Sequence, residues 1–199
     1  MNIIIIIVGL ISILGADFGP NINVSEGLGT LNKRPDIAVD INNIIHVVWI
    51  NADNNANVYY ARSEDHGNTF STPAQVNSVD GYAIEITYSG PKIESVGNTI
   101  HIIWADERNG YDETNIYYSR SLDGGDTWTV EIPIGDDLKF NLYPEISTSD
   151  NGNIHVIYYS YGRRFLDFQN IFHLSSADTG QSFSDDEIVN NYSGAIPCE

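Results

Sequence analysis

Short runs of hydrophobic residues, separated by polar turns, recur along the chain after residue 34. Each copy opens with a Pro-led segment that contains Ile, followed by a run of consecutive apolar residues that ends in Trp or Tyr. A third run begins with Asn and is rich in aromatic residues, and a weaker fourth segment closes the copy. No stretch of ten or more residues has apolar positions at the spacing of an α-helix. The pattern therefore predicts an all-β protein built from short strands.

This four-segment pattern occurs three times in the same order. Its opening prolines are Pro35, Pro91 and Pro144, so the copies are offset by 56 and 53 residues. The second runs occupy residues 45–49, 100–104 and 154–158. Because these runs are apolar at successive positions, we expect both faces of each sheet to be covered. A repeat of about 50 residues with four strands is typical of a β-propeller blade.

The fold class that follows is a β-propeller of four-stranded antiparallel blades, of which three are present. We expect a signal peptide at 1–16, a lead-in at 17–34, blades at 35–90, 91–143 and 144–196, and at 197–199 the start of a fourth blade, if one follows. Closed propellers have about four to eight blades. The chain is therefore expected to be the N-terminal part of a longer propeller, or one half of a homodimer that closes a six-bladed ring.

The N-terminus is uncharged, and residues 3–14 are nearly all aliphatic. A run of this length is too short to span a bilayer, which takes about 20 residues. Gly15 and Ala16 then supply the small residues of a cleavage site. We expect a secreted or cell-surface protein, with an uncleaved anchor or a buried strand as the alternatives.

Charge and cysteine content exclude several classes of function. The chain has 9 Lys and Arg against 27 Asp and Glu, a formal net charge of −18. It therefore lacks the clustered positive charge of a nucleic-acid binder and is repelled by anionic membrane surfaces. Its single cysteine, Cys198, excludes an internal disulfide and a Cys-rich zinc site. We expect neither a cofactor nor a bound metal.

A more specific motif, Ser-x-Asp-x-Gly-x-Thr/Ser-Trp/Phe, lies between the third and fourth segments of every copy. In a tight turn the Asp carboxylate can accept backbone N–H groups nearby, the Gly permits a positive φ, and the aromatic ring can pack between sheets. The residues to which we assign this structural role are Ser63, Asp65, Gly67, Phe70, Ser121, Asp123, Gly125, Trp128, Ser176, Asp178, Gly180 and Phe183.

This motif resembles the Asp box of the BNR-repeat β-propellers, the group that contains the sialidases. The resemblance covers residues 34 to about 190, and in that family the box is a folding element on the outer rim. A sialidase-like mechanism would need three Arg for the substrate carboxylate, a Tyr nucleophile activated by a Glu, and an Asp acid/base. Three blades would hold at most part of this set, so we expect no activity from this chain alone and assign no catalytic residue.

Candidate ligand-binding residues lie in the loops that the topology places opposite the Asp boxes. One loop holds Asp106, Arg108 and Asp112, where an Arg beside acidic residues binds a ligand or forms a surface ion pair. Arg34 lies near the position at which sialidases have the first of their carboxylate-binding arginines.

A further loop holds Tyr161, Arg163 and Arg164. Two adjacent arginines suit bidentate recognition of a carboxylate. The alternative is a solvated loop without a ligand.

The histidines His46, His101 and His155 occupy the same position of the second run in all three copies. A residue that recurs at the same position of every blade has a structural role in the blade. We therefore interpret these histidines as hydrogen-bonded core residues.

These observations predict a secreted or surface Asp-box propeller module, incomplete as given, that binds carbohydrate or an extracellular protein or acts as a scaffold. The alternative is the N-terminal portion of a sialidase-like exo-glycoside hydrolase.

Overall fold

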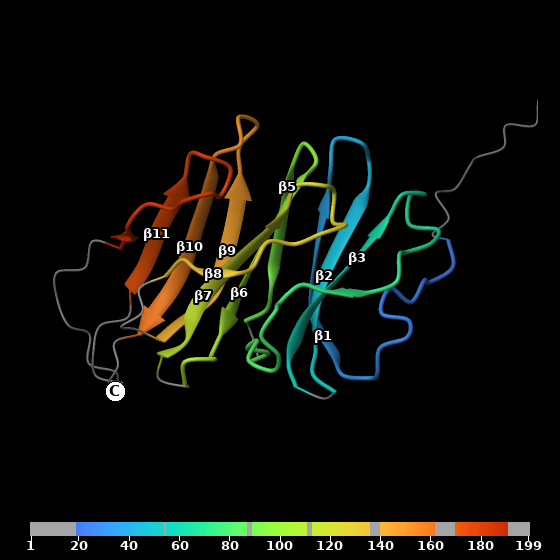
Figure 1. Ribbon diagram of the computed structural model, residues 1–199, viewed down its shortest axis with the longest axis horizontal. Coiled ribbons are helices and arrows are strands. Elements are labelled where there is room, and N and C mark those ends of the chain that lie inside the picture. The colour runs from blue at the N-terminus through green and yellow to red at the C-terminus, as the bar shows by residue number, and fades with distance from the viewer. Residues whose placement is uncertain are drawn as a thin grey trace, which may run out of the picture.

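The structure, a computed structural model, describes residues 19–53, 55–86, 89–110, 113–135, 140–161 and 170–190. Within these ranges the chain forms three four-stranded antiparallel sheets and no α-helix. The sheets stand side by side in sequence order (Figure 1). The prediction of an all-β partial propeller with three blades is confirmed. The proposed signal peptide lies outside the described residues.

In each sheet the four strands are paired in sequence order. The first sheet consists of β1 (Asn32–Val39), β2 (Ile45–Asn51), β3 (Asn57–Ser63) and β4 (Ala74–Gln75). The second consists of β5 (Lys92–Val96), β6 (Thr99–Asp106), β7 (Asn115–Ser121) and β8 (Ile132–Pro133). The third consists of β9 (Phe140–Thr148), β10 (Ile154–Tyr161), β11 (Asn170–Ser176) and β12 (Glu187–Ile188).

The hydrophobic core consists of two layers, one between each pair of neighbouring sheets. Val48 and Ile50 of β2 pack with Trp104 of β6 in the first layer. Ile103 of β6 packs with Val156 of β10 in the second. Seven of the eight residues of β6 are buried because this strand lies between two layers. Cover on both faces therefore explains why the apolar residues of β6 are consecutive, as the sequence predicted.

The third sheet has one uncovered face. Along β10 buried residues alternate with exposed or partly exposed ones. Ile157 is 44% exposed and Ile171 of β11 is 42% exposed. The expectation that both faces of every sheet are covered is therefore wrong for this sheet, because no other described segment packs on its outer face.

The repeated histidines differ accordingly. His46 and His101 are fully buried, and each makes a 2.7 Å hydrogen bond to the hydroxyl of Tyr60 or Tyr118 on the next strand. Their prediction as hydrogen-bonded core residues is confirmed. His155 is exposed and pairs with His173 at 3.1 Å, so its prediction as a core residue is wrong. It points to the face that lacks a neighbouring sheet.

The Ser-x-Asp-x-Gly turns have nearly the same hydrogen bonds in all three sheets. In the first turn the Asp65 carboxylate accepts bonds from the backbone N–H and the hydroxyl of Thr69, at 2.8 and 2.6 Å, and one from the Ser63 hydroxyl at 2.8 Å. The Ser63 hydroxyl accepts the Gly67 N–H at 2.8 Å. Because the bonds from Thr69, and next from Ser63, favour the charged carboxylate, the pKa of Asp65 falls to about 2.

A polar and aromatic contact joins the first sheet to the second at these turns. The Tyr60 hydroxyl and an Arg62 guanidinium N–H donate to the same carbonyl, that of Gly124, at 3.2 and 2.8 Å. The Trp128 ring meets the Tyr60 ring edge to face, with centroids 5.0 Å apart. The carbonyl is presented by a left-handed backbone, with φ of 75° at Gly124.

The second and third sheets repeat this contact. Arg120 donates to the carbonyl of Thr179, whose φ is 56°. The rings of Tyr118 and Phe183 meet edge to face with centroids 4.9 Å apart. We call this arrangement the latch. Its donor half is a Tyr and an Arg two residues apart on the third strand, and its acceptor half is the turn of the next sheet.

We predict that Gly180→Ala destabilises the protein more than Gly67→Ala. Both glycines have a positive φ, of 80° and 87°, so both substitutions strain the backbone. A Cβ on Gly180 would also collide with the Tyr118 hydroxyl, whereas one on Gly67 would meet only Ile45, at 3.5 Å. We expect urea denaturation to show an extra loss of about 1–3 kcal/mol for Gly180→Ala. Equal losses would contradict a steric role for the latch.

Burial of His101 predicts a pH dependence of stability. Desolvation, and then the nearby Arg120, lower its pKa to about 4. The unfolded state therefore binds one more proton than the folded state between about pH 6.5 and 4. The stability from neutral His101 is complete above this window, and it declines by up to about 1.4 kcal/mol per pH unit as the pH falls through it. The change His101→Gln should reduce this slope by the contribution of one proton and leave that of His46, whose pKa is also lowered by burial. The change His155→Gln, at the exposed position, should leave the slope intact.

Candidate functional site

The two ends of the sheets carry different structures. The third strands begin and the second strands end at one end, as the pairings Asn51 with Asn57 and Asp106 with Asn115 show. We call this the loop end. The Ser-x-Asp-x-Gly turns lie at the other end, where β3, β7 and β11 finish. The candidate residues that the structure describes, Arg34, Asp106, Arg108 and Tyr161, therefore lie at the loop end.

An asparagine at the start of each third strand holds the loop end together. The Asn57 side-chain oxygen accepts bonds from Asn77 at 2.9 Å and from the Gly81 N–H at 2.8 Å. At the equivalent positions the Asn170 side-chain oxygen accepts a bond from Asn190 at 3.2 Å, and the Asn115 side-chain N–H donates to the Gly135 carbonyl at 3.1 Å. The loops thus leave from fixed points, which favours a preorganised binding surface.

Arg34 lies at a distortion of strand β1. The register with β2 shifts between Lys33 and Asp36, and Arg34 has a φ of 55°, which is unusual for a residue other than glycine. Bulges of this kind reorient side chains beside binding sites. Arg34 is exposed, and no described residue forms an ion pair or hydrogen bond with its guanidinium.

Residues immediately before the three repeat prolines lie next to one another. A Cβ placed on Gly90 would come within 2.5 Å of the Arg34 Cβ, and the Tyr143 N–H donates to the hydroxyl of the adjacent Ser89 at 3.4 Å. Tyr143, with a φ of 53°, repeats the conformation of Arg34. We call Arg34, Gly90 and Tyr143 the pre-proline row. In this row Gly90 lies between a residue with a cationic side chain, Arg34, and a residue with a phenol side chain, Tyr143.

Arg108 is part of an ion-pair network. Its guanidinium donates twice to Asp106, at 2.9 and 2.8 Å, and once to Glu131 at 2.8 Å. Its carbon Cζ lies 4.0 Å from the centre of the Tyr117 ring. The side chains of both acids are fully buried, and that of Arg108 is 13% exposed.

Electrostatics of this network fix its protonation. Burial alone would lower the pKa of Arg108, but the bonds to Asp106 and Glu131 outweigh it and raise the pKa. Burial would raise the pKa of Glu131, yet hydrogen bonds from backbone N–H groups and from Arg108 lower it. Arg108 and Glu131 therefore stay charged, and Arg108 has few donors left for a ligand. Of the two interpretations of Arg108, the geometry favours the ion pair.

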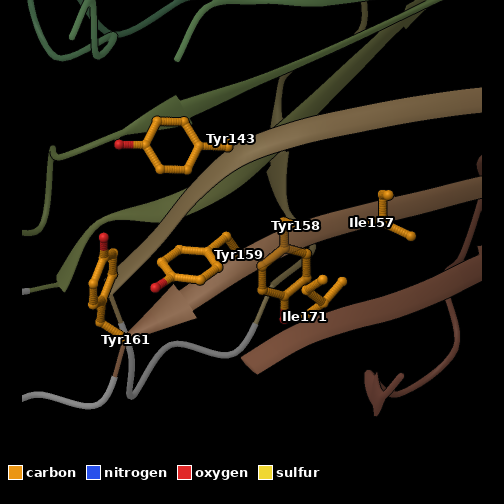
Figure 2. A pocket seen from close by; sticks show the side chains of 6 residues that line it. All are labelled: Tyr143, Ile157, Tyr158, Tyr159, Tyr161 and Ile171. Carbon is orange, nitrogen blue, oxygen red and sulfur yellow. The ribbon is translucent and has the colours of Figure 1, made fainter. Parts of the chain in front are cut away.

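Tyrosines line a hollow on the outer face of the third sheet (Figure 2). Its volume is about 290 Å³. Tyr159 and Tyr161 meet edge to face with ring centroids 4.5 Å apart, and Tyr143 lies 6.1 Å from Tyr159. Ile157 and Ile171 line the rest of the hollow. Tyr161, a predicted binding residue, thus lines the same hollow as Tyr143 of the pre-proline row, with Tyr159 in contact with both.

The structure brings together only part of the predicted site. Asp106 and Arg108 contact each other, while Asp112, Arg163 and Arg164 lie outside the described residues. Sequence reasoning missed Glu131, which is 23 positions from its partner Arg108, and it did not single out Tyr143. Aligning the residues before the repeat prolines would have identified Tyr143.

The described ranges lack two further features. They contain no cluster of three or more His, Cys, Asp or Glu that could hold a metal ion. They also contain no helix that could cross a bilayer.

The three sheets are similar in fold to parts of larger solved structures. An alpha-L-arabinanase of Penicillium chrysogenum, complexed with arabinobiose, has a TM-score of 0.62 and 19% identity over 81% of this chain and 50% of its own. A Hadza microbial sialidase has a TM-score of 0.56 and 16% identity over 77% of this chain and 36% of its own. An ulvan lyase bound to a GlcA(1-4)Rha3S ligand has a TM-score of 0.56 and 16% identity over 83% of this chain and 38% of its own.

This chain thus spans half or less of the length of these structures. At such identities the likeness shows the fold, a partial β-propeller. No protein-family model and no curated protein matches the sequence.

We predict that Arg108→Met destabilises the protein by about 3–5 kcal/mol, because it leaves two buried carboxylates without their cation while keeping the aliphatic packing. The matched variant Arg34→Met should change the free energy of unfolding by less than about 0.5 kcal/mol. Urea denaturation of both variants measures the difference. Similar small effects would show that the network is dispensable.

Proposed function

We propose that this chain is part of a secreted or cell-surface Asp-box propeller module, with blades at 35–90, 91–143 and 144–196, that binds carbohydrate at its loop end. The three equivalent Ser-x-Asp-x-Gly turns support the Asp-box assignment. Each forms the same hydrogen bonds between its Ser, its Asp and the residue four positions after the Asp. Structural neighbours that include an arabinanase, a sialidase and an ulvan lyase support a carbohydrate as the ligand.

One observation carries the proposed site: no residue of the described ranges pairs with the guanidinium of Arg34. The structure describes six Lys and Arg residues, and each of the others bonds to a carboxylate or a carbonyl. In a chain with a net charge of −18, acidic partners are abundant. An exposed arginine on a distorted strand, left without one, is suited to binding an anion from solution.

The proposed ligand is an acidic glycan, one with a uronate or similar carboxylate. The planar guanidinium of Arg34 matches a carboxylate bidentately. Gly90 has no side chain to collide with Arg34, which packs directly against it, and the phenol rings of Tyr143 and Tyr161 supply apolar faces and hydroxyl groups for a sugar ring. Arg163 and Arg164 remain proposed contributors from the neighbouring loop.

A second candidate is the N-terminal portion of a sialidase-like exo-glycoside hydrolase. Two observations favour it, the likeness to a sialidase fold and the place of Arg34 near the first carboxylate-binding arginine of that family. Under this proposal Arg34 would hold the substrate carboxylate, and the reacting groups would come from beyond this chain.

We predict that the protein binds a glucuronate-containing oligosaccharide more tightly than the matching neutral oligosaccharide. Arg34→Ala should weaken this binding by roughly tenfold or more, because it removes a charge-assisted bidentate pair. Arg34→Lys keeps the charge but not the planar fork and should fall between the two. Isothermal titration calorimetry measures all three affinities.

Equal affinity for the acidic and neutral sugars, or no effect of Arg34→Ala, would contradict the proposed site. A fluorogenic sialoside separates the two candidates when it is given to a longer chain that includes the reacting groups. Turnover by that longer chain would favour the hydrolase, and no turnover would favour the binding module. This chain alone should show no turnover under either proposal.

A further inference from the structure

The donor half of the latch is missing from the third sheet. Tyr60 and Arg62 supply it on the first sheet. The same positions on β11 are His173 and Ser175. His173 is bonded to His155 at 3.1 Å, and a serine side chain is too short to replace an arginine. The outer face of the third sheet therefore lacks the groups that hold the other sheets together.

The acceptor half, in contrast, is complete on the first sheet. His66 and Gly67 have positive φ angles of 61° and 87°, as do Gly124 and Gly125 in the occupied latch. Gly125 is buried, and the Tyr60 hydroxyl lies where its Cβ would be. Gly67 is partly exposed. No described residue donates a hydrogen bond to the His66 carbonyl.

A hollow of about 420 Å³ lies beside this open acceptor. Phe70 lines it from the turn, and Ile22 and Val24 of the lead-in line it from the other side. At the two occupied latches the equivalent aromatic residues, Trp128 and Phe183, lie against a tyrosine of the preceding sheet. Among the described residues, Phe70 has no such tyrosine.

We propose that the turn of the first sheet is a docking site for a propeller sheet whose third strand carries Tyr-x-Arg. The two latches within the chain provide the template, since each joins that strand to an equivalent turn. The docked tyrosine would occupy the hollow beside Phe70, and the arginine would donate to the His66 carbonyl. A second copy of this chain is not that partner, because its free sheet presents His173 and Ser175. The partner sheet lies outside these 199 residues.

The test installs the missing donor half in this chain. The variant H173Y/S175R gives the third sheet the donor pair of the first two sheets, and its new tyrosine can bond to His155 as Tyr60 does to His46. Sheet three of one copy should then dock on sheet one of another, forming a closed ring or an open chain. By sedimentation velocity we expect roughly tenfold or tighter self-association than for the native chain.

Two controls identify the surface. Adding Gly67→Ala to H173Y/S175R should return self-association to the native level, because the new Cβ occupies the place of the docked hydroxyl. Circular dichroism and thermal unfolding establish that each variant folds. Asn68→Asp, which reproduces the ion pair of Arg62 with Asp126 (2.7 Å), should strengthen the association of the double variant.

Two results would overturn the proposal. In one, folded H173Y/S175R sediments as the native chain does. In the other, the native chain itself self-associates through this turn, with loss on Gly67→Ala, so that a second copy is the partner.

Discussion

The burial of both faces of a four-stranded sheet is the constraint on which this structure depends. A sheet with apolar residues at successive positions has no face suited to water and is stabilised by packing between two others. The second sheet meets this condition, with seven of the eight residues of β6 buried. The latch also fixes how neighbouring sheets are aligned, because a tyrosine and an arginine reach the turn of the following sheet only when the two sheets are in register.

The same constraint positions the candidate site. Because turns and latches hold one end of the sheets, the loops gather at the other end. There the pre-proline row brings together residues far apart in sequence, Arg34 and Tyr143, around Gly90. A rigid scaffold with variable loops is a common arrangement for binding proteins. The acidic composition makes an unpaired arginine at this end the clearest functional feature of the molecule.

Much of the fold was predictable from sequence, because the repeat encodes local structure three times. The strands and the Ser-x-Asp-x-Gly turns depend on residues within a few positions of each other. The exposure of His155 was not predictable from its own segment, since it depends on whether another sheet covers that face. The partner of Arg108 could not be found either, because Glu131 reaches it only after the chain returns along β7. Arg34 was a candidate from sequence, but the strand distortion at which it lies was not predictable.

Native-state hydrogen exchange tests most directly whether each sheet is stabilised by its neighbours. Amide exchange should be slowest in β6 and β7, which have a sheet on either side, and faster in β10 and β11, which have a sheet on one side. If the third sheet is protected as strongly as the second, cover by a neighbouring sheet is not what stabilises these strands, and the account is wrong.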